Sequence, residues 1–497
     1  MSKFKVLLVY PNLQMVNLLP SNIAVLSAYL KKHGIEVRLF DTTLYHTSEK
    51  SIDEVRVENM QLRSFNLQEK GISYRKSEVY DDFKKTVREY SPDIVAVSAT
   101  DATYNLGVDL ISVAECANRH IIFGGVFPTF APEKVISNHK VNSVCIGEGE
   151  EPLLELCERL RDGKDISNIQ NLWIKINGRI YKNKIRKPVD INLLPYEDFS
   201  IFEEKRFYRP MQGKIFRMIP FSIDRGCPFE CTFCAAPLKR KLYKDSGNGN
   251  YFRTKNIAGI IQELKFQIKK YNAEYIFFNS ETFFARNEKD IEYFAKQYSK
   301  QINLPFWCQT RIETITENRV RMLEDMRCDR ISIGIEHGNE KFRKKILRKN
   351  FTNQQAIDAL KIIAKSKIPV TVNNIIGFPD ETRELVFDTI ALNRKINADS
   401  ISTFFFVPYH GTPLRQYSIE RGYLNPEIQP DTPMISSILN MPQFPPEQIN
   451  GLMRTFPLYV KMPKSFFKKI KAAEQLTPEG NIVLKELREI YFKEYFK

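Results

Sequence analysis

Two blocks of alternating strand-like and helix-like segments make up most of this chain, and a connector rich in proline and aromatic residues separates them. The first block carries short apolar runs with amphipathic helical patterns between them, and the expected strands are 5–10, 36–41, 93–98, 120–123 and 141–146. Such alternation predicts a doubly wound α/β domain, with a sheet of mostly parallel strands covered by helices. The sequence therefore predicts a Rossmann-like domain over residues 1–165.

The second block repeats the alternation with six strand–helix units, whose expected strands are 217–224, 275–279, 306–310, 330–335, 370–376 and 400–407. Six such units predict a partial (β/α)6 barrel over residues 215–422, with its active site at the carboxyl ends of the strands. Residues 166–214 are expected to form a hairpin, with Asn177-Gly178 as a type I′ turn, followed by an interdomain connector. Residues 423–497 are expected to form a small helical cap.

Three cysteines, Cys227, Cys231 and Cys234, follow the first expected strand of the barrel with the spacing C-x3-C-x2-C. Thiolates hold iron–sulfur clusters, and three of them can anchor only three irons of a cubane, which leaves the fourth iron open. Structural zinc is the alternative, but zinc favours four closed ligands in pairs, and the candidates for a fourth ligand lie roughly 75 to 110 residues away. These candidates are Cys308, Cys328 and His337.

The run Asp-Arg-Gly-Cys-Pro-Phe-Glu-Cys-Thr-Phe-Cys at 224–234 resembles the signature of the radical S-adenosylmethionine (radical SAM) enzymes. In that family the open iron of a 4Fe-4S cluster is chelated by the methionine moiety of SAM, and one electron cleaves the sulfonium to a 5′-deoxyadenosyl radical. The resemblance implies that Cys227, Cys231 and Cys234 are cluster ligands and catalytic residues, and that Phe233 shields the cluster beside SAM. It also implies a one-electron reductant such as flavodoxin or ferredoxin.

The resemblance extends to the strand ends of the second block, where it implies residues that bind SAM. Glu281 matches an acidic residue that accepts a hydrogen bond from the methionine amino group, and Glu336 matches a glutamate that contacts the ribose or amino group. Arg348 matches a basic residue that meets the methionine carboxylate. Gln309 or Arg311 is expected inside the barrel, where arginine could pair with a carboxylate or form a salt bridge at the rim.

Three further residues follow from the same resemblance. Gly377 lies in the turn 375–381, which resembles the turn that packs on adenine. His337 stands where many relatives carry serine, so it is a candidate for proton exchange near the substrate or for a supporting role behind the site. Tyr409, in the turn 407–414 that closes the sixth strand, is a second candidate for the substrate side.

Loops after the strands of the first block indicate a second cofactor, because ligands of such sheets bind outside the carboxyl ends of the strands. A G-x-G-x-x-G turn after the first strand would indicate NAD or FAD, but the chain reads Pro-Asn-Leu-Gln-Met there. Segments 124–130 and 147–152 instead resemble the cobalamin-binding domain that precedes the radical SAM domain in one large subgroup. The residues that this resemblance places on cobalamin are Asn12, Thr100, Asp101, Thr103, Gly124, Gly125, Val126, Gly147, Glu148 and Gly149.

The D-x-H-x-x-G fingerprint of other cobalamin proteins is absent, since His46 follows Asp41 at the wrong spacing. No histidine ligand to cobalt is therefore expected, and a base-off cobalamin would meet the loop 100–104 with its lower face. The alternative is a domain without cobalamin, kept for the substrate or as a scaffold.

Taken together, the resemblances imply a cobalamin-dependent (class B) radical SAM methyltransferase that acts on an unactivated carbon of a small-molecule, lipid or peptide substrate. The nearest alternative is a cyclase or oxidase of the same subgroup without methyl transfer. A radical SAM RNA methylthiotransferase is less favoured, because Cys116, Cys145 and Cys157 fall in two expected helices and a strand rather than in a cluster motif. An electron carrier or corrinoid-binding regulator would leave Glu281, Glu336 and Arg348 without a role.

Composition agrees with a globular enzyme, at 43% hydrophobic and 27% charged residues. No run approaches the roughly 18 to 20 apolar residues of a membrane span, and the amino terminus enters a strand without a secretory signal. We therefore expect a cytoplasmic protein without a transmembrane segment. The net charge of +15 is spread along the chain, which favours a solvated surface over nucleic-acid binding. The basic run 464–471 is expected to cover the barrel rather than lie on a membrane.

Overall fold

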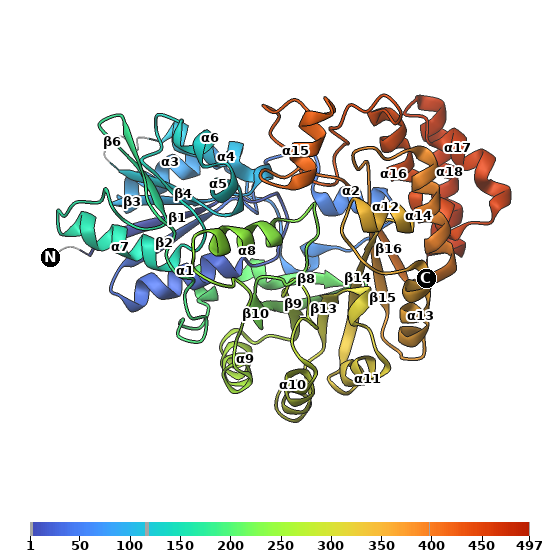
Figure 1. Cartoon of the computed structure of the whole chain (residues 1–497), viewed down its shortest axis with the longest axis horizontal. Helices are drawn as coiled ribbons and strands as arrows, with labels where there is room; N and C mark the ends of the chain where they lie inside the picture. The colour runs from blue at the N-terminus through green and yellow to red at the C-terminus, as the bar shows by residue number, and fades with distance from the viewer. Residues whose placement is uncertain (1–2, 115–118, 397, 497) are drawn as a thin grey trace.

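The computed structural model describes residues 3–114, 119–396 and 398–496. Figure 1 shows the first domain at one end of the molecule, the curled sheet of the second domain in the middle and the carboxyl-terminal helices at the far end. The helix expected around Cys116 lies partly outside the described residues. In the part of the chain that the structure describes, no helix is both long and apolar enough to cross a membrane.

The first sheet has the strand order β2-β1-β3-β4-β5-β6-β7, and its first five strands are parallel. These are β1 (Lys5–Tyr10), β2 (Glu36–Asp41), β3 (Ile94–Ser98), β4 (His120–Gly124) and β5 (Ser143–Cys145). The helices of this domain are α1 (Ser21–Lys32), α2 (Ile52–Glu58), α3 (Val79–Tyr90), α4 (Tyr104–Val113), α5 (Val126–Phe130), α6 (Pro132–Ile136) and α7 (Glu150–Arg161). The four central residues of β1 are all buried, as expected for a strand covered on both faces. The prediction of a doubly wound α/β domain is confirmed.

The hairpin that the sequence assigns to the connector extends this first sheet. Its strands β6 (Leu172–Ile176) and β7 (Arg179–Lys182) are antiparallel, and β6 pairs with β5. Asn177 and Gly178 both have positive φ, 50° and 79°, as a type I′ turn requires. The first structural unit therefore reaches residue 182, because backbone hydrogen bonds to β5 fix the hairpin at the edge of the sheet.

The connector then packs against both domains. Arg206 is buried and pairs through Nε with Oδ2 of Asp41 at 2.8 Å, at the end of β2. On the other side, the rings of Phe199 and Phe207 lie 5.6 and 5.4 Å from the ring of Tyr271 in the barrel domain. The connector is therefore part of both cores rather than a free linker.

A second sheet has the order β16-β15-β14-β13-β12-β9-β8, in which all strands but β8 are parallel. Its strands are β8 (Tyr208–Met211), β9 (Lys214–Phe221), β12 (Tyr275–Phe278), β13 (Phe306–Thr310), β14 (Cys328–Glu336), β15 (Val370–Ile376) and β16 (Ser400–Phe405). The intervening helices are α8 (Ala235–Asp245), α9 (Ile257–Tyr271), α10 (Glu288–Gln301), α11 (Glu317–Asp325), α12 (Glu340–Lys345), α13 (Asn353–Ala364) and α14 (Arg383–Ile396). The prediction of a partial (β/α)6 barrel is confirmed.

The carboxyl-terminal region is helical, as expected, with α15 (Pro413–Glu420), α16 (Pro446–Lys461), α17 (Phe467–Ala473) and α18 (Pro478–Glu494). Arg394 of α14 donates to the carbonyl oxygens of Tyr459, Val460 and Met462. Arg383 pairs with Glu474 at 2.6 Å, and Tyr459 donates to the same carboxylate. These contacts fix the cap onto the end of the barrel.

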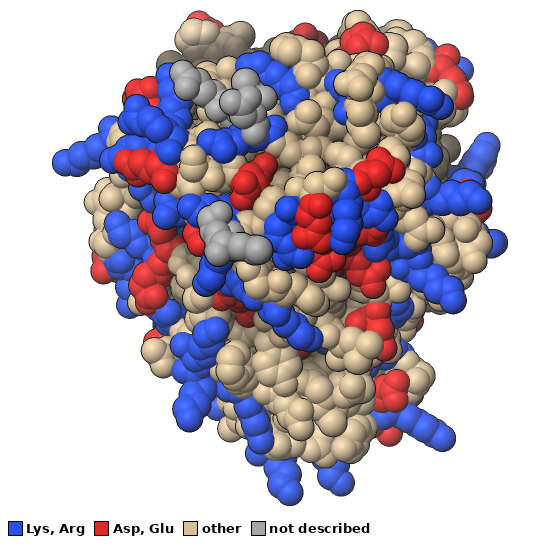
Figure 2. Space-filling model, turned by 90° about the vertical axis from the view of Figure 1, so that its left-hand side faces the viewer, with Lys and Arg blue, Asp and Glu red and all other residues tan. Residues whose placement is uncertain are grey.

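Charge on the outer face of the first domain follows the expected pattern. Figure 2 shows Lys and Arg side chains interspersed with Asp and Glu over this face, rather than gathered into one basic stripe. Nucleic-acid binding proteins usually carry such a stripe or patch. This face therefore offers no argument for a nucleic-acid partner.

Candidate functional site

The cysteine loop begins directly after β9, where β10 (Asp224–Arg225) pairs with β11 (Arg253–Thr254) and directs the chain across the barrel mouth. Cys227 is buried, and Cys231 and Cys234 are partly exposed. Cys234 caps α8, because its Sγ accepts from the N–H of Ala236 at 3.4 Å. Burial raises the pKa of Cys227, and raises that of Cys234 to about 12. Thiolates at these positions therefore need a bound cation to stabilise them, and a metal ion that they ligate would supply that charge.

Among the described residues no three His, Cys, Asp or Glu side chains converge as ligands of one metal ion, and this holds for the three thiols of the loop. A cubane spreads its thiolates over three different irons, so its ligands need not meet at one point.

Arg311, expected inside the barrel, contacts the cysteine loop. Its Nη1 donates to Sγ of Cys231 at 2.9 Å, and its Nη2 donates to Oε1 of Glu313 at 2.5 Å. The guanidinium also lies 4.0 Å from the ring centre of Phe229. Arg311 thus places a positive charge on the sulfur of Cys231, and in this arrangement its guanidinium is engaged by the cysteine loop and Glu313.

Glu336 and a neighbouring lysine form a buried pair at the end of β14. Glu336 has φ +65° at an irregularity between β14 and β15, and its Oε1 lies 3.0 Å from Nζ of Lys349. The carboxylate folds over Gly334, where an added Cβ would lie 2.0 Å from Oε1. Lys349 is only 3% exposed, whereas Arg348, the residue expected to meet SAM, is exposed. Lys349, which the sequence analysis did not name, is therefore the basic side chain that pairs with Glu336, while Arg348 stays a prediction.

The other residues expected to bind SAM lie around the cysteine loop. Glu281 is exposed, and its charge acts on both Cys227 and Cys234. Gln309 donates through Nε2 to the carbonyl oxygen of Ser280, beside Glu281, at 3.3 Å.

Two turns complete this side of the barrel. The ring of Phe233 lies 5.9 Å from that of Phe378. Phe378 follows Gly377, which has φ +83°. Oε2 of the buried Glu381 accepts from the N–H groups of both turn residues. The structure therefore places the turn around Gly377 beside the cysteine loop.

The two candidates for the substrate side differ in their positions. His337 has no exposed surface, stacks on Phe342 at 4.3 Å and lies 3.0 Å from Glu381 through Nε2. His337 therefore supports the barrel wall, and it does not line the cavity between the two domains that is described next. Tyr409 is partly exposed, and burial raises its pKa to about 12, assisted by the charge of Asp101 and of Cys234. Tyr409 is therefore near both the cysteine loop and the first domain.

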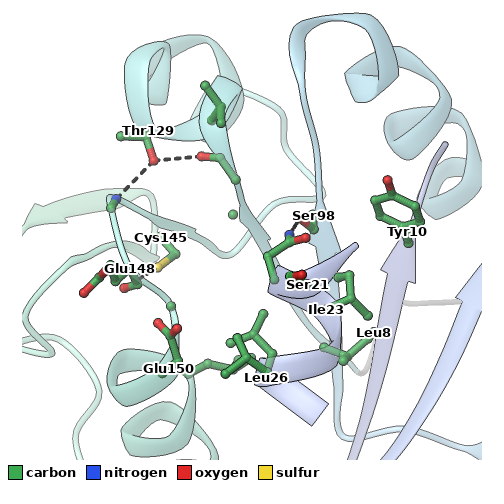
Figure 3. Close-up of a pocket in the computed structure, with 18 of the residues that line it drawn as sticks. Leu8, Tyr10, Ser21, Ile23, Leu26, Ser98, Thr129, Cys145, Glu148 and Glu150 are labelled. Carbon is green, nitrogen blue, oxygen red and sulfur yellow. Dashed lines mark hydrogen bonds between the residues drawn. The ribbon is translucent and has the colours of Figure 1, made fainter. Parts of the chain in front are cut away.

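A cavity of about 590 Å³ lies at the carboxyl ends of the first sheet, between the first domain and the barrel. Figure 3 shows residues of the first domain that line it. Every residue expected to contact cobalamin lines it, apart from Asp101. Asp101 instead joins the domains, because its Oδ1 lies 2.7 Å from Nδ1 of His410 and accepts from the N–H of His410 at 3.1 Å. His410 belongs to the turn after β16, and its ring meets that of Phe127 edge-on at 4.9 Å.

Two glycine loops form the cradle on the side of the first domain. Gly125 has φ +110°, and a Cβ there would lie 2.5 Å from the carbonyl oxygen of Ala99. Gly147 has φ +83°, and a Cβ there would lie 2.5 Å from the hydroxyl of Tyr243. Thr129 joins the two loops, since its Oγ1 donates to the carbonyl oxygen of Gly125 at 2.7 Å and accepts from the N–H of Gly147 at 3.0 Å (Figure 3). Glycine at both positions thus lets the loops pack tightly against Ala99 and Tyr243, which shapes the cavity wall on this side.

The opposite wall comes from residues that the sequence did not single out. The connector and the segments around the cysteine loop supply Ile191, Leu194, Pro195, Glu197, Ser222, Asp224, Arg225, Lys239, Tyr243, Tyr251 and Lys255. No sequence pattern marks these residues as a group, because they meet only when the connector and barrel fold against the first domain.

Glu148 lines the cavity, but its carboxylate is also the centre of an interdomain network. It pairs with Arg225 and Arg253 and accepts from the N–H of Val189 at 2.9 Å. Burial acts to raise the pKa of Glu148, but the two arginines outweigh it and leave the pKa lowered. Glu148 is therefore an anion that joins first domain, connector and barrel, beyond the ligand contact expected of it.

Comparison with known families now assigns both domains. Residues 17–157 match the B12 binding domain, and residues 221–392 match the Radical SAM superfamily. An uncharacterized methyltransferase of Pyrococcus horikoshii is 27% identical over 400 residues, which cover 79% of this chain and 83% of the relative. The anaerobic magnesium-protoporphyrin IX monomethyl ester cyclase of Rubrivivax gelatinosus is 22% identical over 71% of this chain and 64% of the relative.

The fold is also similar to a solved structure. TsrM of Kitasatospora setae, a radical S-adenosylmethionine methyltransferase with cobalamin and a 4Fe-4S cluster bound, superposes with a TM-score of 0.67. The match covers 98% of this chain and 100% of TsrM at 14% sequence identity. The domain order and the curled sheet are therefore those of a known architecture.

Proposed function

From the premise that this chain is a radical SAM enzyme with an N-terminal B12-binding domain, we propose that it methylates an unactivated carbon of a small-molecule, lipid or peptide substrate. The observation that carries the proposal is the cavity between the two domains, which the glycine loops of the B12-binding domain and the segment preceding the cluster cysteines line together. A corrinoid in this cavity would therefore lie beside the segment that leads into the cysteine loop, as methyl transfer requires.

The residues present fit the two cofactors. For the cluster, three thiols lie in one loop at the barrel mouth, and burial raises the pKa of two of them. For cobalamin, Gly125 and Gly147 let the two loops pack closely on Ala99 and Tyr243, and the loop 100–103 carries Thr100 and Thr103 on the cavity wall. No histidine lines the cavity among the described residues, and we propose base-off binding with the loop 100–104 below the cobalt.

When bound, the cluster would supply reductive cleavage of SAM and cobalamin would supply methyl transfer. The chain's own residues position and shield these groups. Cys227, Cys231 and Cys234 would hold the cluster, and Arg311 would donate to the sulfur of Cys231. Glu281 and Glu336 would bind the polar groups of SAM by accepting from an amino or hydroxyl group. Lys349, whose Nζ donates to the carbonyl oxygen of Gly334 and pairs with Glu336, would hold the Glu336 carboxylate in place.

Tyr409 stands between the cluster loop and the B12-binding domain, where we propose that it contacts the substrate. The cluster needs a one-electron donor such as flavodoxin or ferredoxin, so we place the enzyme in the reducing environment of the cytoplasm.

The experiment that tests this function uses the full chain, reconstituted anaerobically with iron and sulfide and then incubated with hydroxocobalamin and desalted. We expect a four-iron cluster and about one cobalamin per chain, and then transfer of a deuteromethyl group from labelled SAM to carbon of an accepted substrate. Cys227→Ser should abolish SAM cleavage. Labelling only at nitrogen or oxygen would contradict the proposal.

The similarity to the cyclase keeps cyclisation or oxidation without methyl transfer as a second candidate. The two candidates give different products from the same assay. A cyclase would cleave SAM and remove hydrogen from its substrate while leaving the deuteromethyl label on unreacted SAM or on methionine.

A further inference from the structure

Two carboxyl groups on the wall that faces the B12-binding domain have no part in the chemistry above. Glu197 comes from the connector and Asp224 from β10, and both line the interdomain cavity. They are 7% and 5% exposed. Oε2 of Glu197 and Oδ2 of Asp224 are buried and have no hydrogen-bond partner among the described residues. Leaving a polar atom buried and unpaired is costly, so each carboxyl group has hydrogen-bonding capacity that the described residues do not use.

The cations near Glu197 already serve other carboxylates. The charged groups that act on it are Lys255, Glu263 and Arg225. Nζ of Lys255 is 2.7 Å from Oε2 of Glu263, and Arg225 pairs with Glu148 and Glu150 at 2.8 Å each. No cation among the described residues is thus committed to Glu197, and burial raises the pKa of its carboxyl group to about 7.

Asp224 has a similar environment. Arg286 and Glu281 are the charged groups that act on it, with opposite effects, and Ser280 gives a hydrogen bond. The guanidinium of Arg286 donates to the carbonyl oxygen of Ile223 and forms no ion pair with Asp224 in the described part of the chain. Burial raises the pKa of Asp224 to about 7 as well.

Resting on the proposed function, we propose that Glu197 and Asp224 bind the corrinoid as neutral carboxylic acids, donating hydrogen bonds to carbonyl oxygens of the amide groups around the corrin ring. A protonated carboxyl group is a donor, and an amide carbonyl is its natural acceptor. A phosphate would meet two acids whose ionised forms repel it, and the sulfonium of SAM would favour those ionised forms. Amide carbonyls are the class of ligand group that matches two buried acids without a cation.

This assignment gives the connector a function in cofactor recognition. Family resemblance points only to the loops of the B12-binding domain, which approach the ligand with backbone and small side chains. The side chains of Glu197 and Asp224 would bind the ring from the opposite side, so that the corrinoid is held between the two domains.

The pH dependence follows from the donor role. Both groups donate only when protonated, so affinity for the corrinoid falls as pH rises through about 7, where the groups ionise. If the ionised forms lose one hydrogen bond each, affinity at about pH 8.5 should be roughly 30-fold weaker than at about pH 6.

The test is equilibrium dialysis of methylcobalamin, in the dark, against the cluster-reconstituted full chain at several pH values. Methylcobalamin is chosen because its upper ligand does not ionise in this range. Glu197→Gln and Asp224→Asn keep a neutral donor, and we expect both to retain affinity and together to remove the loss at high pH. Glu197→Ala should weaken binding about 5- to 20-fold at about pH 6. Glu203→Gln, at an exposed glutamate of the same connector, is the matched control and should behave as wild type.

Outcomes separate this inference from the function it rests on. If wild type binds no corrinoid at any pH, the cofactor assignment itself fails. If wild type binds but Glu197→Gln and Asp224→Asn keep the pH dependence of wild type, the donor role is overturned while the function stands. Circular dichroism of each variant shows whether it folds, and the Gln and Asn variants keep the test valid if Glu197→Ala does not.

Discussion

Nη1 of Arg225 lies 2.8 Å from Oε1 of Glu148, and this ion pair connects the start of the cysteine loop to a loop of the B12-binding domain. Arg225 stands two residues before the first cluster cysteine, and the same nitrogen is 2.8 Å from Oε1 of Glu150. Arg253 of β11 binds the Glu148 carboxylate from the barrel side. A displacement of either loop therefore acts directly on the other.

Removing the charge of Glu148 should destabilise the chain. In Glu148→Gln the buried arginines lose their counter-charge, and breaking a buried pair in this way costs about 3–5 kcal/mol. The free energy of unfolding, from urea titration of the full chain, measures the loss. Glu133→Gln, at an exposed residue 3.4 Å from Lys182, is the control and should change stability by less than about 0.5 kcal/mol. Equal effects of the two variants would contradict the role of Glu148.

The contribution of Glu148 should also depend on pH in a defined direction. The pKa of Glu148 is lowered in the folded chain. Its stabilisation is therefore present above the unfolded pKa, about 4.3, and is lost as pH falls through the folded pKa. The difference in unfolding free energy between wild type and Glu148→Gln should shrink below about pH 4.5. A difference that grew on acidification would show that the arginines do not hold Glu148 ionised.

Gly125→Ala should impair corrinoid binding. At φ +110° a Cβ would lie 2.5 Å from the carbonyl oxygen of Ala99, so backbone must move and the cradle changes shape. Gly163→Ala is the matched control, because Gly163 also has positive φ, +63°, but has nothing within 4 Å of the added Cβ. We expect weaker methylcobalamin binding, by roughly tenfold or more, only in Gly125→Ala. Similar affinities of both variants for methylcobalamin would mean that Gly125 is needed only for its backbone conformation and not for the shape of the cavity.

Lys349, rather than Arg348, should determine affinity for SAM. Lys349→Met removes the buried partner of Glu336 and leaves that carboxylate unpaired, whereas Arg348→Met alters an exposed side chain. We expect isothermal titration of SAM to give about tenfold weaker binding in Lys349→Met and less than about a twofold change in Arg348→Met. A larger loss of SAM affinity in Arg348→Met than in Lys349→Met would contradict this prediction and support Arg348, the residue that the family resemblance favours.

His410→Ala should loosen the contact between the domains without removing the cluster. The variant leaves Asp101 without its partner at 2.7 Å and removes the ring that meets Phe127. Hydrogen exchange of the amides in 100–104 and 407–412 should accelerate, while iron content stays that of wild type. His139→Ala, at an exposed histidine, is the control. Unchanged exchange in His410→Ala would show that other contacts hold this interface.

Local patterns in the sequence were sufficient to predict strands such as β1 and the loops that follow them. Burial on both faces makes strands such as β1 continuous apolar runs, and glycines at 124–125 and 147, directly after expected strands, indicate loops where backbone approaches a ligand closely. Periodicity does not say which strand a hairpin joins, which is why β6 and β7 were expected in the connector.

Contacts between residues that are far apart in the sequence could not be predicted from the sequence. Glu197 lies in no motif and Asp224 opens the run 224–234 without an assigned role, and only the packing of connector and barrel brings them to one cavity. The structure also brings in Lys349 beside Arg348, the residue that the resemblance favours, and the difference between the two has a conformational reason. Arg348 has φ +53°, a conformation rare outside glycine, and the next side chain, that of Lys349, is the one that points inward.

Helix α8 has a consequence for the geometry of the two cofactor sites. It begins at Cys234, whose sulfur caps it, and near its other end the hydroxyl of Tyr243 accepts from the N–H of Glu148 at 2.9 Å. One rigid segment, about 16 Å long at 1.5 Å per residue, thus connects the cysteine loop to the glycine loop of the first domain. The spacing between these two loops is then set by a count of residues. A single insertion in α8 would turn Tyr243 by about 100° and break its contact with Glu148.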